Sequence, residues 1–260
     1  MSAVTPRGAY FAGHFPGRPI LPGVALLAIV LETLARDTGR AAALRAIPFA
    51  RLRRPVGPRD ALAVEGRDGE GGRVRFDVRC DGALVANGEL ILGRPDEAGT
   101  AAARATRTSP AAGAARATAL PVASLVPQQP PMRFVTAIVA EAPDGLTCAA
   151  QIPAACALVS EGSAPALVAL EAAAQTAAAW EAMRRWHEAS VASPRMGYLV
   201  AVRDVELFAA RIPADETLLA SVRLDATAPP LMHYAVEVTL AARRILRGTV
   251  ATVLADELVG

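Results

Sequence analysis

One histidine of the sequence lies among glycines and prolines, directly before an apolar segment. Residues 11–32 read FAGHFPGRPILPGVALLAIVLE, which places His14 a few residues before a predicted helix. Imidazole is the side chain that most readily gives and takes protons near neutral pH. Pro22 fits a first helical turn, and Gly23 leaves the adjacent backbone open to close approach. The N–H groups of such a helix start suit a carbonyl oxygen that becomes more negative during a reaction.

The helix and strands that would position these groups are predicted in the same order in both halves of the sequence. The first half predicts a helix over about 22–36 and strands over 43–54, 61–67, 73–80 and 83–92. The second half predicts strands over 132–141 and 145–152, a helix over 164–187, and strands over 197–211, 217–225, 232–241 and 244–254. One long helix against consecutive antiparallel strands, made twice, predicts an α+β architecture of two curved sheets, each wrapping a central helix.

The segment between the two series predicts a linker. Residues 96–118 read DEAGTAAARATRTSPAAGAARAT and contain neither a bulky apolar residue nor an amphipathic period. We therefore expect one domain over residues 1–95, which carries His14, and a second over residues 119–260. The two units would pack side by side.

The histidine segment carries a long and particular motif. It resembles the hotdog-fold 3-hydroxyacyl-acyl-carrier-protein dehydratases of bacterial fatty-acid synthesis, whose signature is G-H-F-P-G-x-P-x-x-P-G-V. Residues 13–24 match it at nine positions, Phe15 among them. The first half looks most similar to the short dehydratases of aryl-polyene biosynthesis. The resemblance implies that His14 is the acid/base residue, that the Gly23 N–H binds a thioester carbonyl, and that Phe15 and Pro22 belong to the same substrate-binding segment.

The first half departs from this family at one important position. The family's catalytic carboxylate lies fourteen residues after the histidine, and here that residue is Ala28. Taken alone, the first half therefore holds only one member of the catalytic pair. The second half resembles the opening of the same dehydratases in LVPQQPPMRFVTAIVAE and their helix motif in VALEAAAQTAAAW.

The second half has the complementary departure. Glu171 and Gln175 match the family's glutamate and glutamine, whereas Ala157 stands where the family has histidine and Ala166 where it has the helix-start glycine. In the homodimeric relatives, the histidine of one subunit faces the carboxylate helix of the other. A fused pair would therefore build one complete site from His14 and Glu171, with a dead counterpart, in a double hotdog arranged as a pseudo-dimer.

Other readings of these residues compete with catalysis. Glu171 could be a surface position of an alanine-rich helix, and Gln175 could fill a packing position as readily as orient the glutamate. Glu32, one helical turn after Ala28, is the rival carboxylate. We interpret His187 and His233 as structural. A cluster of arginines could attract an acidic carrier protein or form a solvated face: Arg18, Arg51, Arg53 and Arg54.

Composition excludes several classes of function. The net charge of +2 is too small to predict nucleic acid as a partner, and the longest apolar run is too short to predict a membrane span. Three cysteines without C-x-x-C spacing predict small core residues, with neither a disulfide framework nor a metal site. The N-terminal segment lacks the pattern of a secretory signal, which favours a cytoplasmic location.

The expected reaction is dehydration of a 3-hydroxyacyl thioester to the trans-2-enoyl product, in fatty-acid, polyketide or aryl-polyene biosynthesis. The alternatives are a hotdog-fold acyl thioesterase and a non-catalytic scaffold that binds an acyl carrier. No metal or organic cofactor is expected, because the phosphopantetheine arm belongs to the carrier-bound substrate. Expected partners are acyl carrier protein and a ketosynthase or ketoreductase of the same pathway. The chain could remain a monomeric pseudo-dimer or form a homodimer of it.

Overall fold

The first half of the chain folds as one helix over a curved antiparallel sheet. The computed structural model describes residues 2–39, 43–93, 121–189 and 195–254, so the predicted linker at 96–118 lies outside the described residues. In the first half the elements are β1 (Ser2–Val4), a 3-10 turn η1 (Gly8–Phe11), α1 (Gly23–Thr38), β2 (Ala43–Leu52), β3 (Leu62–Asp68), a 3-10 turn η2 (Glu70–Gly72), β4 (Arg73–Cys80) and β5 (Ala83–Gly93).

Helix α1 forms where the apolar segment predicted it. Pro22 is its N-cap, and the first turns, from Val24 to Val30, are buried throughout. A helix that is apolar on all sides is stable only inside a core, which is where the sheet places it. The helix ends at Gly39, whose φ of 63° is left-handed and favours glycine. The residues beyond this cap return as β2.

The second half repeats this arrangement with a longer helix. Its elements are a 3-10 turn η3 (Val122–Ser124), β6 (Val135–Ala142), β7 (Gly145–Ala150), β8 (Ser163–Pro165), a 3-10 turn η4 (Ala166–Val168), α3 (Ala169–Ala189), β9 (Gly197–Leu207), β10 (Arg211–Pro213), β11 (Leu218–Ala228), β12 (Leu231–Leu240) and β13 (Arg243–Leu254). Alanine has the highest helix propensity, and the small side chains of α3 let it lie close to the sheet.

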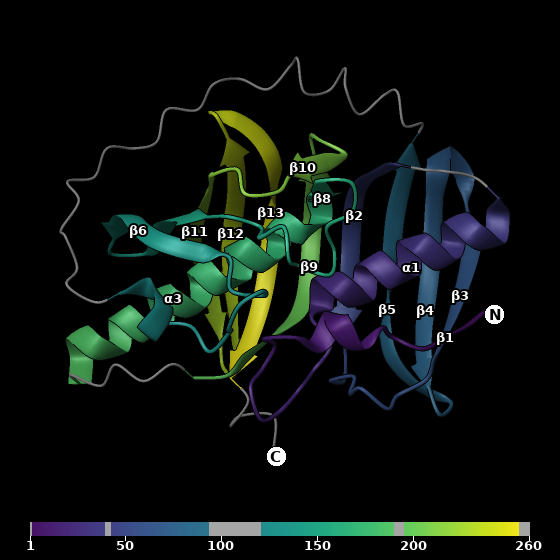
Figure 1. Cartoon of the computed structure of the whole chain (residues 1–260), viewed down its shortest axis with the longest axis horizontal. Coiled ribbons are helices and arrows are strands. Elements are labelled where there is room, and N and C mark those ends of the chain that lie inside the picture. The colour runs from purple at the N-terminus through teal and green to yellow at the C-terminus, as the bar shows by residue number, and fades with distance from the viewer. Residues whose placement is uncertain (1, 40–42, 94–120, 190–194, 255–260) are drawn as a thin grey trace.

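The two sheets join edge to edge into a single surface. The strand order is β1-β3-β4-β5-β2-β9-β13-β12-β11-β7-β6, all pairs being antiparallel, and the halves meet where β2 pairs with β9. Figure 1 shows α1 lying across the strands of the first half and α3 across those of the second. One hydrophobic cluster runs through both halves. The predicted α+β double hotdog, two sheets wrapped around two helices as a pseudo-dimer, is confirmed, with the joined sheet as an added feature.

The predicted elements differ from the structure mainly at their ends. The second helix was expected over 164–187, but residues 163–165 form a short strand paired with β10, and 166–168 form a 3-10 turn before α3 begins. Strand β1 was not predicted; it pairs with β3 at the outer edge of the sheet. Within the described ranges, none of the helices has the length and apolar character needed to cross a membrane.

Candidate active site

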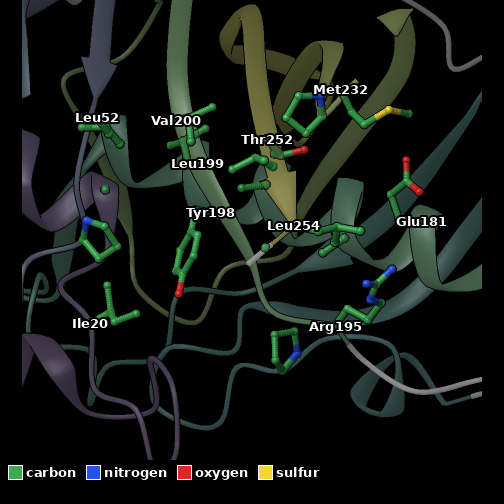
Figure 2. Close-up of a pocket in the computed structure, with 18 of the residues that line it drawn as sticks. Ile20, Leu52, Glu181, Arg195, Tyr198, Leu199, Val200, Met232, Thr252 and Leu254 are labelled. Carbon is green, nitrogen blue, oxygen red and sulfur yellow. The ribbon is translucent and has the colours of Figure 1, made fainter. Parts of the chain in front are cut away.

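A cavity of about 400 Å³ lies between the two halves of the molecule. His14 and Gly23 of the first half and Glu171 of the second line it together. Figure 2 shows its span: Ile20 and Leu52 lie on one side, Glu181 and Arg195 on the other, and residues of β9 run between them. The predicted histidine, helix-start glycine and glutamate therefore share one cavity.

The histidine is held by its own loop. The Nδ1 atom of His14 lies 2.9 Å from the carbonyl oxygen of Ile20, and the Ile20 N–H donates to the His14 carbonyl at 2.8 Å. Since a carbonyl oxygen can only accept, Nδ1 carries the proton in this hydrogen bond. The other ring nitrogen, Nε2, is left as the basic atom. Phe15 stacks on the imidazole with ring centroids 4.0 Å apart, which fixes the ring plane.

A glycine joins this loop to the second half. Gly13 has a φ of 78°, and a Cβ atom at this position would lie only 2.1 Å from the carbonyl oxygen of Gln129. The Gln129 N–H donates to the Gly13 carbonyl at 2.9 Å. Only glycine permits both the left-handed conformation and the close approach of the two backbones. The motif glycine before the histidine thus docks the first-half loop onto the segment that opens the second half.

Glu171 is held from the opposite side by two amides. It lies in the first turn of α3, where the helix dipole favours a carboxylate. Its Oε1 atom accepts hydrogen bonds from Gln175 Nε2 at 3.0 Å and from Gln128 Nε2 at 3.2 Å. Gln175 also donates to the Met132 carbonyl and accepts from the Phe134 N–H, so its orientation is fixed. Both donors act on Oε1, which leaves Oε2 for another partner.

The two predicted groups meet across the boundary between the halves. His14 Nε2 lies 4.0 Å from Glu171 Oε1, and the residues are 7% and 3% exposed. This confirms the expectation that the second-half carboxylate approaches the first-half histidine. An imidazole and a carboxylate at this separation, both largely buried, can act on neighbouring atoms of one small substrate.

The starts of the two helices differ in their backbone hydrogen bonding. The N–H of Gly23 opens α1, and it donates to no residue in the described part of the chain. At the matching position of the second half, the Ala166 N–H donates to the Ala210 carbonyl at 2.9 Å. At this aligned position, within the described residues, the first helix start keeps a free N–H group and the second does not. Leu52 and Leu199 pack beside Gly23, and a Cβ atom there would lie 2.6 Å from Leu52 Cδ1.

Three predicted site residues lie behind the cavity wall. Phe15, Pro22 and Gln175 are not among the residues that line the cavity. They act on those that do: Phe15 contacts His14, Pro22 caps the helix that presents Gly23, and Gln175 holds the glutamate.

The rival carboxylate and the arginine cluster are placed differently. The Glu32 side chain is 51% exposed, lies 3.6 Å from an arginine on the surface, and does not line the cavity. Arg53 and Arg54 line the cavity near Leu52, whereas Arg18 and Arg51 do not. Half of the predicted arginine cluster therefore borders the site.

The cysteine prediction and the structural reading of His187 fit the structure. His187 Nδ1 lies 3.6 Å from Glu141 Oε1 on β6, a contact between the end of α3 and the sheet. The reading of His233 as structural stays a prediction. All three cysteines are buried and free. Burial raises the pKa of the Cys148 thiol to about 12, and it raises the pKa of Cys156, beside Glu171, as well. Buried thiols of raised pKa are inert core residues.

Gln128 is the site residue that sequence reasoning missed. It lines the cavity and donates a hydrogen bond to Glu171. The sequence indicates only that its segment resembles the opening of the dehydratases. Its Oε1 atom is buried and has no hydrogen-bond partner among the described residues. Leaving such an acceptor unsatisfied costs about 1–3 kcal/mol. A glutamine near the start of the domain gives no signal of this in the sequence.

The unit of a sheet wrapped around a helix occurs twice, which defines a double-hotdog protein. An imidazole and a carboxylate share the pocket between its halves. The model of the ApeP dehydratase family, described as ApeP-like, matches residues 120–259, more than half of the chain. The ApeI-like dehydratase model matches residues 2–89. The chain belongs to this dehydratase family, with an ApeI-like first half and an ApeP-like second half.

Curated relatives and solved structures agree with this assignment. The chain is 35% identical over 113 residues to the 3-hydroxyacyl-[acyl-carrier-protein] dehydratase FabZ of Roseiflexus sp. (strain RS-1), covering 36% of this chain and 73% of that one. FabZ of Syntrophotalea carbinolica is 38% identical over 103 residues, covering 34% of this chain and 67% of that one.

Two solved dehydratase domains share the whole fold. A monomeric dehydratase domain from a trans AT polyketide synthase split module gives a TM-score of 0.68 at 11% identity, covering 98% of this chain and 97% of that one. The dehydratase domain of RzxB from Pseudomonas fluorescens gives a TM-score of 0.63 at 14% identity, covering 92% and 86%. At these identities the likeness concerns the fold.

Proposed function

We propose that the protein dehydrates 3-hydroxyacyl thioesters carried on acyl carrier protein, through one composite active site. The observation that carries the proposal is the approach of His14 Nε2 to Glu171 Oε1, 4.0 Å, in a cavity that also presents the Gly23 N–H. One half supplies the base and the oxyanion donor, and the other supplies the carboxyl group. On this proposal, residues 1–95 and 119–260 act as two domains that are catalytically incomplete alone.

The proposed elimination assigns one role to each group. The Gly23 N–H and the dipole of α1 stabilise the thioester oxygen, which gains negative charge as the C2–H bond breaks. His14 Nε2 takes the C2 proton, and the electron pair forms the C2=C3 bond. The C3–O bond breaks, and the hydroxyl leaves as water with a proton passed to it by Glu171. Transfer of a proton from the imidazole to the carboxylate restores both groups.

Two amide groups prepare Glu171 for this role. Gln128 and Gln175 both donate to Oε1, so negative charge on the carboxylate is stabilised on that atom. Oε2 is then the atom that meets the 3-hydroxyl group of the substrate. A carboxylate restrained in this way needs little reorganisation when the substrate enters, which favours turnover.

The substrate and partners follow from the same site. A carrier-bound thioester brings its own phosphopantetheine arm, so we propose that the reaction requires neither a metal nor an organic cofactor. Arg53 and Arg54 border the cavity near Gly23, where an acidic carrier would deliver the thioester. The carrier and a ketosynthase or ketoreductase of the same pathway are the proposed partners. The proposed location is the cytoplasm, where such carriers are found.

The test is to incubate the purified protein with a 3-hydroxyacyl carrier substrate and to follow the acyl group by mass. Loss of one water from the carrier-bound acyl group is the expected result. Release of the free hydroxy acid would indicate a thioesterase, and an unchanged substrate would indicate a binding scaffold. Glu32→Gln is the matched control for Glu171→Gln, because it removes an exposed carboxylate outside the cavity and should keep full activity.

A further inference from the structure

The cavity continues past the reacting groups along one face of α3. Six residues of this helix line the cavity: Glu171, Ala174, Ala178, Glu181, Arg184 and Arg185. All but Arg184 follow one another at a spacing of three or four and therefore form one stripe. Between the first and fourth of them, only the two alanines keep accessible surface. Because two small alanine side chains form the floor of this groove, it leaves room for the acyl chain of a substrate.

The order of the reacting groups sets the direction in which a substrate lies. The thioester carbonyl belongs at Gly23, C2 at His14 and C3 at Glu171, so the carrier arm lies on the side of Leu52 and Arg53. The rest of the acyl chain must then leave C3 on the far side of Glu171, along the alanine stripe. Figure 2 shows Val200, Thr252 and Leu254 between Leu52 and Glu181, so the middle of the cavity is mostly apolar.

The far end of the cavity is polar. The buried Tyr234 hydroxyl donates to Glu181 Oε1. Arg184 is satisfied by hydrogen bonds to Glu181 at 3.3 Å and to Glu188 at 3.1 Å. Arg185 differs: its side chain is only 19% exposed, and its closest ion-pair contact, to Glu181, is 4.0 Å.

The guanidinium of Arg185 makes no hydrogen bond to any residue within the described ranges, although it has five N–H donors. Burial lowers the pKa of this guanidinium, with the neighbouring arginines adding to the effect. A desolvated cation with unused donors is costly unless a partner arrives. Its place on the cavity wall means that such a partner would come from the substrate.

We propose that Arg185 is a specificity-determining residue, which binds a hydrogen-bond-accepting oxygen at the far end of the substrate acyl chain. This inference rests on the proposed dehydration, and it adds a second polar contact between the protein and the substrate. The substrate has a polar thioester and hydroxyl at one end, an apolar middle against Ala174 and Ala178, and an oxygen at the other end. Glu181 flanks the same position and accepts a hydrogen bond when that oxygen belongs to a hydroxyl group.

The distance between Glu171 and the far end of the cavity also sets the length of the acyl chain. Ten residues separate Glu171 from Glu181, which is about 15 Å along the helix axis. The Arg185 side chain leans back towards the preceding turn, as helical side chains do, and so reaches the same level as Glu181. The terminal oxygen therefore lies roughly a dozen bonds beyond C3.

The experiment compares two carrier-bound 3-hydroxyacyl substrates of this length, one ending in a hydroxyl group and the other in a methyl group. For the native chain, kcat/KM for dehydration should be at least about tenfold higher with the hydroxyl-terminated substrate, as expected for a hydrogen bond to a charged donor. Arg185→Met should bring the ratio close to one. Arg223→Met removes an exposed arginine outside the cavity and should leave the ratio unchanged.

The outcomes separate this inference from the function on which it rests. No dehydration of either substrate would overturn the proposed function itself. Dehydration with equal kcat/KM for both substrates, unaffected by Arg185→Met, would overturn the distal site alone. If Arg185→Met raised KM equally for both substrates, the residue would act on the carrier arm rather than on the chain end, and the inference would be wrong. Loss of the preference when the hydroxyl group is moved several carbons nearer to C3 would support it.

Discussion

Removing either member of the histidine–glutamate pair should abolish turnover, and removing both should do no further harm. The substitutions are His14→Ala, Glu171→Gln and the double variant. Glu171→Gln suits the purpose because an amide oxygen can still accept from Gln128 and Gln175, whereas the group loses its acidic proton. The fold and the position of α3 should therefore be preserved, and circular dichroism with thermal unfolding would check this.

The magnitude follows from the 4.0 Å contact between two buried side chains. A positioned acid or base contributes about 10²- to 10⁴-fold, so each single variant should lose that much of kcat. If His14 and Glu171 acted independently, the losses of the double variant would multiply. Groups that act on one substrate as a unit lose nearly everything with the first deletion, so the double variant should be about as slow as either single one.

The assay is single-turnover conversion of a carrier-bound 3-hydroxyacyl substrate, sampled by mass spectrometry, so that chemistry is separated from product release. Two results would refute the reasoning. A Glu171→Gln variant with more than a tenth of native turnover would show that the carboxyl group is dispensable. Multiplicative losses in the double variant would show that the pair does not act as a unit, despite its geometry.

Three other predictions test the surroundings of the pair. Gln128→Leu removes a hydrogen-bond donor to Glu171, so turnover should fall about tenfold. It also removes a buried oxygen that has no partner among the described residues, so the unfolding temperature should stay level or rise. Gln129→Leu changes an exposed neighbour and is the control in both measurements. Gly23→Ala should lower kcat by tenfold or more, since its Cβ atom would push the tip of Leu52 towards the thioester site. Fragments divided within residues 96–118 should each be inactive in the mass assay and should regain dehydration when mixed, and an active isolated first half would contradict the composite site.

Local patterns were sufficient to predict most of the elements, although not β1 or β8. The apolar run that starts at Pro22 carries its own periodicity, whereas the nine-position motif and the resemblance to homodimeric dehydratases supplied the role of His14 and its pairing with Glu171. The joining of β2 to β9 could not be predicted in this way. Which open edges meet is decided by the packing of the two halves rather than by either sequence segment.

The same limit applies to Gln128 and Arg185. Each is an ordinary polar residue in its own stretch of sequence. Their significance lies in the contacts that they lack within the described part of the chain: Gln128 Oε1 has no hydrogen-bond partner there, and the Arg185 guanidinium has an ion-pair contact of 4.0 Å but no hydrogen bond. Unsatisfied groups become visible only when every neighbour in space is known, because a hydrogen bond that is not made leaves no trace in a pattern of residue types.

The difference between the two helix starts fits a duplicated fold that holds a single active site. In a homodimer, one sequence must serve both sites, so neither can lose a group without the other. A fused chain is free of this constraint, and here the losses fall on one side. The position that mirrors His14 is Ala157, and the N–H of Ala166 is already bonded to Ala210, so it cannot stabilise a developing oxyanion. On the proposed mechanism, the second site therefore lacks both the base and the donor at this position, and dehydration would take place in the cavity that keeps both.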